Sequence, residues 1–168
     1  MASSVSLRVA SLGDASAVSR VLESSYPKLM ASAYKSEELR AALPMMTRAQ
    51  PSLLESGTYY VVETIDGFVV GCGGWTRERP GSGDIHPGLG HVRHFGVHPE
   101  WTRQGIGSLI YLRCVADATV AGVERFECFS SLNGEAFYSA LGFTSLEHID
   151  QEMSEGVFLP GIRMLAEI

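Results

Sequence analysis

The residues best suited to chemistry lie at positions 92–108, where the chain runs VRHFGVHPEWTRQGIGS. A strand-like segment ends at Val97, and Gly105 and Gly107 open a strongly helical stretch. The first N–H groups of a helix lack partners within the helix, and its dipole is positive at this end, so a bound anion is favoured there. Glycine lets a phosphate approach the backbone because no Cβ intrudes. The spacing therefore predicts a diphosphate-bearing ligand at the start of this helix.

Alternative roles for the glycine pair compete with this prediction. A P-loop needs Lys before its Ser or Thr, and Ser108 is not preceded by one. A Rossmann fingerprint needs a third small residue where this chain has Ile110, and it belongs in the first strand–helix unit. A glycine pair can also serve only a turn and close packing.

A second group of small and aromatic residues follows at positions 130–143, which read SSLNGEAFYSALGF. With the first segment, it resembles motifs A and B of the GNAT superfamily of N-acetyltransferases. The matching residues are Val97, Pro99, Gly105 and Gly107 in the first motif, and Phe137, Tyr138, Gly142 and Phe143 in the second. The chain departs from the first motif at Thr102, where Arg or Gln is usual, and Asn133 is slightly displaced. The resemblance extends over about residues 57–149.

The resemblance implies that acetyl-CoA is the co-substrate. In the family, backbone amides of the glycine loop hold the pyrophosphate, and the pantetheine arm pairs with the exposed edge of the preceding strand. The residues that this assigns to cofactor binding are Phe95, Gly96, Val97, Arg103, Gln104, Gly105, Ile106, Gly107, Ser108, Asn133 and Phe137.

Acetyl transfer from a thioester to an amine needs a base, an oxyanion donor and a group that protonates the departing thiolate. By resemblance, the oxyanion donor is a backbone N–H near Val97 and the general acid is Tyr138; the alternative for Tyr138 is a core tyrosine. His91 stands where many relatives carry a catalytic glutamate, and an ordinary histidine can act as a base near neutral pH. A packing histidine is an equal alternative for His91. Other candidate bases are Glu63, Glu78 and Asp84.

Metal chemistry and covalent catalysis are not expected. The histidines that invite a zinc site are His86, His91, His94 and His98. Strand alternation predicts opposite faces, with His91, Arg93 and Phe95 on one and Val92, His94 and Gly96 on the other. His91 and His94 on opposite faces of a strand could not bind the same metal ion, so no metal site is expected. None of Cys72, Cys114 and Cys128 is placed like an activated nucleophile, which favours direct transfer in a ternary complex.

The predicted fold is α/β (α+β), a GNAT-like mixed, mostly antiparallel sheet of about seven strands flanked by about four helices. The resemblance also implies a splay between the fourth and fifth strands. Asp66-Gly67 predicts a hairpin, Cys72-Gly73-Gly74 predicts a bulge or a close approach of another backbone segment, and Pro27 predicts the end of the first helix. The predicted strands are 5–9, 59–63, 68–75, 90–97, 124–129, 143–149 and 162–168, and the predicted helices start near 15, 36, 105 and 133.

Length and composition fit one domain over residues 1–168 with an ordinary hydrophobic core, since 45% of the 168 residues are hydrophobic. The net charge of −6 argues against nucleic-acid binding, and the chain has no apolar run of membrane-spanning length. An odd cysteine count and the lack of a signal peptide favour the cytoplasm.

The predicted function is acyl-CoA-dependent N-acyltransfer, most simply of acetyl, to a primary amine. The alternative is a noncatalytic CoA- or nucleotide-binding module on the same fold. The acceptor, a small-molecule or peptide amine, is expected among segments 26–56, 77–90 and 150–161. Homodimer formation is left open.

Overall fold

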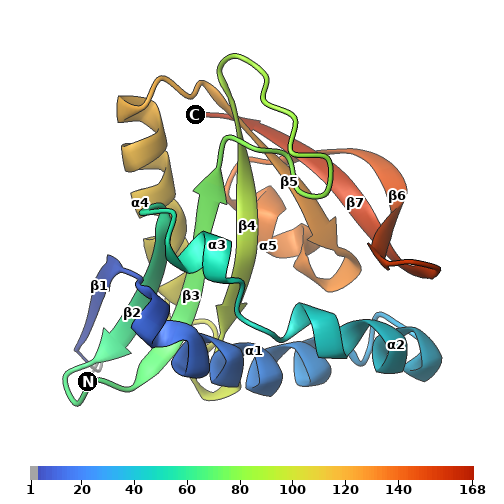
Figure 1. Cartoon of the computed structure of the whole chain (residues 1–168), viewed down its shortest axis with the longest axis horizontal. Helices are drawn as coiled ribbons and strands as arrows, with labels where there is room; N and C mark the ends of the chain where they lie inside the picture. Colours follow the sequence, from blue (N-terminus) through green and yellow to red (C-terminus); the bar gives the residue numbers. More distant parts are fainter. Residues whose placement is uncertain (1–3) are drawn as a thin grey trace.

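A seven-stranded sheet with strand order β1-β2-β3-β4-β5-β7-β6 forms the centre of the computed structural model, which describes residues 4–168 (Figure 1). The strands are β1 (Val5–Val9), β2 (Tyr59–Thr64), β3 (Val69–Thr76), β4 (Leu89–Val97), β5 (Arg125–Ser131), β6 (Thr144–Ser154) and β7 (Val157–Glu167). The helices are α1 (Ala15–Met30), α2 (Ser36–Met46), α3 (Pro51–Leu54), α4 (Ile106–Val120) and α5 (Glu135–Ala140). Neighbouring strands pair antiparallel except for β4 and β5 within the described chain, which confirms the predicted fold class.

Helices cover both faces of the sheet because its central strands carry apolar side chains in both directions. On β2, Tyr60 and Val62 pack into the core under α4, whereas Val61 packs into the core under α1. Such continuous apolar runs are typical of strands buried on both faces. On α4, the residues that face this core are spaced four apart, at Ile106, Ile110, Cys114 and Ala118. No helix among residues 4–168 is both long and apolar enough to cross a bilayer.

The predicted splay between β4 and β5 is present. The two strands pair in parallel only from Leu89 to His91, opposite Arg125 to Glu127. Beyond this point β5 continues to Ser131 with β7 as its partner, and β4 continues to Val97 with β3 as its partner. The sheet is therefore open between β4 and β5 along the second half of β4.

The predicted alternation of faces along β4 is wrong, because β4 contains a bulge. Gly74 of β3 pairs with Arg93, but Cys72 pairs with Gly96, so two residue steps on β3 oppose three on β4. His94 takes a positive φ of 55° at this irregularity. A bulge places consecutive side chains on one face and reverses the alternation after it.

The reversal moves Phe95 to the face of Val92, under α4 and α5, where its ring centroid lies 6.2 Å from that of Tyr138. His94 instead faces α1, with its ring centroid 6.1 Å from that of Tyr26. His91 and His94 consequently share a face, contrary to the prediction. Even so, residues 4–168 hold no group of three or more His, Cys, Asp or Glu side chains suited to a metal ion.

Proline does not end the first helix as predicted. Pro27 lies inside α1, which continues to Met30, and Pro44 likewise lies inside α2. The last turn of α1 is retained because Met30 is buried in a small core with Leu39 of α2 and Leu159 of β7. Tertiary packing thus outweighs the lost backbone hydrogen bond.

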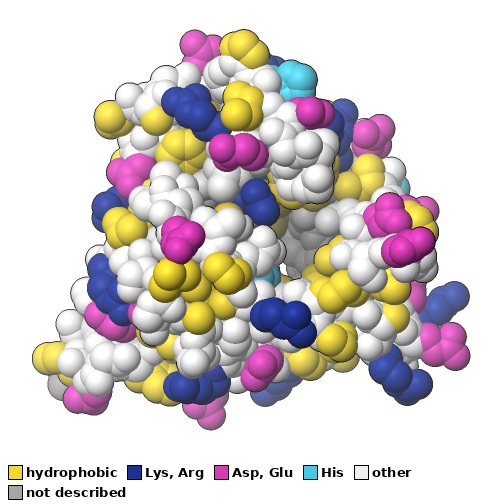
Figure 2. All heavy atoms as spheres, viewed as in Figure 1, with side chains coloured by type: hydrophobic (Ala, Val, Ile, Leu, Met, Phe, Trp, Pro, Cys, Tyr) yellow, Lys and Arg dark blue, Asp and Glu magenta, His cyan; other side chains and the backbone are white. Residues whose placement is uncertain are grey.

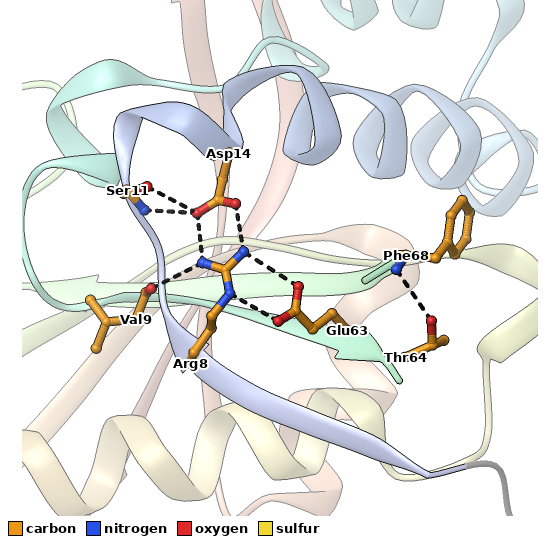
Figure 3. A network of polar contacts seen from close by, with 7 residues as sticks. All are labelled: Arg8, Val9, Ser11, Asp14, Glu63, Thr64 and Phe68. Carbon is orange, nitrogen blue, oxygen red and sulfur yellow. Dashed lines mark hydrogen bonds and ion pairs between the residues drawn. The ribbon is translucent and has the colours of Figure 1, made fainter. Parts of the chain in front are cut away.

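An ion-pair network ties the N-terminal strand to the sheet (Figure 3). The Arg8 guanidinium donates to Asp14 at 2.7 Å and 2.9 Å and to Glu63 at 3.0 Å, so it joins β1, the start of α1 and β2. Its hydrogen bonds lower the pKa of the Asp14 carboxyl. Glu63, one of the candidate bases, is therefore engaged in a structural ion pair.

Candidate active site

A cavity of about 620 Å³ lies at the splay, between the second half of β4, the start of α4, α5 and the β6–β7 hairpin. Figure 2 shows the molecule hollowed between the middle of the sheet and this hairpin. Most of the predicted site residues line it, namely Phe95, Gly96, Val97, Arg103, Gly105, Ile106, Gly107, Ser108, Asn133, Phe137 and Tyr138. Gln104 and His91 do not.

The loop before α4 has the geometry of an anion cradle. Arg103 and Gly105 adopt positive φ angles of 60° and 80°, and Gly105 is the residue immediately before the first helical turn. Left-handed residues alternating with ordinary ones turn successive amides toward one side, which suits an anion. A Cβ added to Gly105 would meet no heavy atom within 4 Å, so the space beside this residue is open.

Gly107 has a different structural role from the one predicted. A Cβ added there would lie 2.8 Å from two ring carbons of Phe137 on α5. The absence of a side chain at Gly107 therefore allows α4 to pack against α5. Gly105, and not Gly107, is the glycine whose missing side chain leaves open space at the cradle.

Tyr138 lies within an aromatic cluster and also lines the cavity. Its ring packs edge-on against Phe137 and Phe143, with centroid separations of 5.0 Å and 5.4 Å. Burial raises the pKa of the Tyr138 phenol well above its usual value, so the hydroxyl keeps its proton at neutral pH. A protonated phenol beside the cavity can donate a hydrogen bond or a proton.

Cys128 lines the same cavity, but its thiol is unsuited to nucleophilic attack. Burial raises the pKa of Cys128 to about 12, so the thiolate is scarce at neutral pH. Burial also raises the pKa of Cys72 to about 12. These directions agree with transfer that does not use an acyl-enzyme.

His91 lies away from the cavity, in a buried polar cluster where β4 and β5 still pair. It is 1% exposed, and its Nδ1 atom lies 3.3 Å from Glu127 Oε1. Glu127 also pairs with Arg79 at 3.3 Å and Arg163 at 3.1 Å. Burial lowers the pKa of His91, against the opposing effect of Glu127. Its surroundings are those of a structural residue at the closed end of the splay.

His94 was not predicted from the sequence as a site residue, yet it lines the cavity. Its Nε2 atom lies 2.6 Å from the Met46 carbonyl oxygen at the end of α2. Since a carbonyl oxygen only accepts, Nε2 carries a proton, and Nδ1 of the neutral ring is left with a lone pair. Nδ1 is buried and has no hydrogen-bond partner. Burial lowers the pKa of His94, with the neighbouring Arg93 acting in the same direction, so the ring is neutral at pH 7.

Two tyrosines hold the bulge that presents His94. Tyr59 donates to the His94 carbonyl at 2.7 Å, and Tyr26 donates to the Phe95 carbonyl at 2.6 Å. Strained backbone conformations persist where the surroundings fix them, often at functional sites. The run Cys72-Gly73-Gly74 was the signal for this bulge, although it indicated only the irregularity in β3 and not its effect on β4.

The segments expected to surround the acceptor contribute unequally. The ends of α1 and α2, within 26–56, and the β6–β7 hairpin, within 150–161, line the cavity, but no residue of 77–90 does. That loop is held elsewhere through the ion pair of Arg79 with Glu127. The candidate bases Glu78 and Asp84 belong to it and also lie outside the cavity lining.

The splayed sheet and the cradle together define a GNAT-type acetyltransferase fold. Residues 55–145 match the acetyltransferase (GNAT) domain family, and the chain belongs to this family. The comparison with curated proteins finds no match.

Solved structures with the same fold include several N-acetyltransferases. One from Rhodopseudomonas palustris superposes with a TM-score of 0.80 at 19% identity, covering 100% of this chain and 98% of that one. The PaiA N-acetyltransferase of Thermoplasma acidophilum, in complex with coenzyme A, gives 0.73 at 16% identity, covering 98% and 99%. N-acetylglutamate synthase of Neisseria gonorrhoeae, complexed with coenzyme A and N-acetyl-glutamate, gives 0.63 at 18% identity, covering 98% and 35%.

Proposed function

We propose that this protein is an acetyl-CoA-dependent N-acetyltransferase that transfers the acetyl group directly to a primary amine in a ternary complex. The observation that carries the proposal is the meeting of three features around one cavity: the anion cradle before α4, the proton donor Tyr138, and His94, a lining residue whose buried Nδ1 has no hydrogen-bond partner. Family membership and the coenzyme A complexes of two proteins with this fold support it.

Acetyl-CoA would bind with its pyrophosphate on the amides of the cradle, from Arg103 to Ser108, and its pantetheine arm in the splay. The opening between β4 and β5 leaves the stretch of β4 around Phe95 to Val97 without a partner strand on that side. Asn133 and Phe137 also line the cavity there. The side chain of Gln104 has no part in this binding, because it donates to the Glu100 carbonyl at 3.3 Å.

In the proposed reaction, the amine nitrogen attacks the thioester carbonyl carbon and the C–S bond breaks. His94 Nδ1 removes a proton from the amine, and a backbone N–H near Val97 donates to the developing oxyanion. Tyr138 donates its proton to the departing sulfur. His91, which the sequence favoured as the base, would need a path to the cavity that its position beside Glu127 does not offer.

Release of free thiol in a single turnover tests the function. Enzyme in excess over acetyl-CoA should convert it to CoA, with one acetylated amine formed per thiol, when a suitable primary amine is present. The control reaction without amine measures thioester hydrolysis. Tight CoA binding in calorimetry without acetylation of any amine in a broad panel would contradict the proposal and favour the noncatalytic CoA-binding alternative.

Tyr138→Phe should lower kcat about 10²-fold and leave the KM for acetyl-CoA nearly unchanged, because only the proton for the leaving sulfur is lost. The phenylalanine ring keeps the packing against Phe137 and Phe143. Steady-state kinetics together with a thermal melt would check both parts. A kcat within about twofold of the parent would reduce Tyr138 to a packing residue.

A further inference from the structure

We infer that the acceptor is a small primary amine with an apolar, uncharged body; this inference rests on the proposed function. It comes from the side chains on the part of the cavity away from the cradle. That wall is made by the C-terminal ends of α1 and α2 and by the β6–β7 hairpin. Its apolar members are Leu29, Met30, Met45, Met46, Met153 and Leu159.

No carboxylate reaches the cavity from residues 4–168, although the whole chain carries a net charge of −6. On the β6–β7 hairpin, Gln151 and Met153 line the cavity, whereas Glu152 between them and Glu155 at the turn are exposed. Strand alternation explains this, since successive side chains point to opposite faces. A second ammonium group on the acceptor would therefore find no counter-ion in the cavity.

A carboxylate on the acceptor would also lack a partner of opposite charge on this wall. The only lysine or arginine side chain in the described lining is Arg103, which belongs to the loop of the cradle and so lies with the proposed pyrophosphate. The other polar side chains that line the cavity from α1, from the segment after α2 and from the hairpin are neutral: Ser25, Tyr26, Gln50 and Gln151. Burying an unpaired charge is costly, so charged bodies of either sign are disfavoured.

Methionine suits an apolar acceptor of variable shape, because its side chain is flexible and polarizable. The volume of about 620 Å³ must also hold the thioester end of acetyl-CoA, which leaves room for a small molecule. The wall is therefore expected to select acceptors by their apolar character and small size rather than by one particular shape.

Three amines with the same six-carbon chain isolate the effect of charge: n-hexylamine, 1,6-diaminohexane and 6-aminohexanoate. With acetyl-CoA and the parent enzyme, kcat/KM for n-hexylamine should exceed that for each of the other two by about tenfold or more. Equal or faster turnover of either charged amine, or of a tripeptide N-terminus, overturns the inference and leaves the proposed function standing. If acetyl-CoA binds and no amine is acetylated, the proposed function fails and this inference fails with it.

A charge introduced into the wall should change the preference. Met45→Glu places a carboxylate at the cavity and should raise kcat/KM for 1,6-diaminohexane relative to n-hexylamine by about tenfold. Ala41→Glu is the matched control, because Ala41 is an exposed residue of the same helix that does not line the cavity. A ratio that shifts equally in both variants, or in neither, counts against the apolar wall as the source of selectivity.

Discussion

Replacing His94 with glutamine should lower kcat by about 10²-fold or more while the protein stays folded. Glutamine can still donate an N–H to the Met46 carbonyl, which now accepts from His94 Nε2, but it cannot accept a proton from the amine. His94→Ala, which loses both the hydrogen bond and the base, should be at least as slow. Calorimetric binding of CoA by the glutamine variant should match that of the parent.

The pH profile separates the role of a base from a structural role. Since the base works unprotonated, kcat/KM should rise with pH through the pKa of His94 in the free enzyme. Burial lowers this pKa from its ordinary value of 6.5, so the acid limb should lie below pH 6.5. The groups around the ring are Arg93 beside it, Tyr26 on α1 and Tyr59 under its carbonyl, and burial keeps both tyrosines neutral by raising their pKa values. His94→Gln should abolish the acid limb.

His91→Gln is the matched control for that profile, because His91 is a buried histidine on the same strand and outside the cavity lining. It should change thermal stability through the contact with Glu127 and keep the acid limb. If His91→Gln removes the limb and His94→Gln keeps it, the base is His91, as the sequence alone suggested.

Gly105→Val should weaken CoA binding by about tenfold or more. The side chain would enter the open space of the cradle, where the protein itself offers no atom within 4 Å. It would also strain the loop, because φ is +80° and a Cβ in the left-handed region costs about 1–2 kcal/mol. Isothermal titration with CoA measures the affinity, and a thermal melt measures the strain.

Gly122→Val provides the control for strain. Gly122 follows the other end of α4, has a φ of +88° and likewise has no heavy atom within 4 Å of an added Cβ, but it does not line the cavity. It should lose similar stability and bind CoA like the parent. Equal loss of CoA affinity in both variants, or in neither, would mean that the cradle does not act as proposed.

The sequence by itself determined the fold class and the position of the glycine loop that precedes α4. The reason is that these features depend on local signals. Asp66-Gly67 specifies a hairpin, and a glycine in the left-handed region at position 105 starts a helix whose first amides are free. The two motifs then fix the order of strand and helix around the splay, and the pairing of β4 with β5 over only Leu89–His91 agrees with it.

The tertiary structure alone decided which side chains reach the cavity. A strand pattern with period two assigns faces correctly only while the strand is regular, and the bulge between Arg93 and Gly96 reverses them. Phe95 thereby turns toward Tyr138, and His94 turns toward α1 and the Met46 carbonyl. His91 precedes the bulge and stays with Glu127, where the two strands still pair.

Packing between segments distant in the sequence also determined where α1 ends and what Gly107 does. α1 runs through Pro27 because Met30 is buried against Leu39 and Leu159, contacts that no local pattern contains. The sequence predicts that Gly107 leaves space for a phosphate, yet its missing Cβ makes room for the Phe137 ring of another helix. Local sequence fixes where backbone amides and turns lie, whereas the partners of a side chain depend on residues far away in the chain.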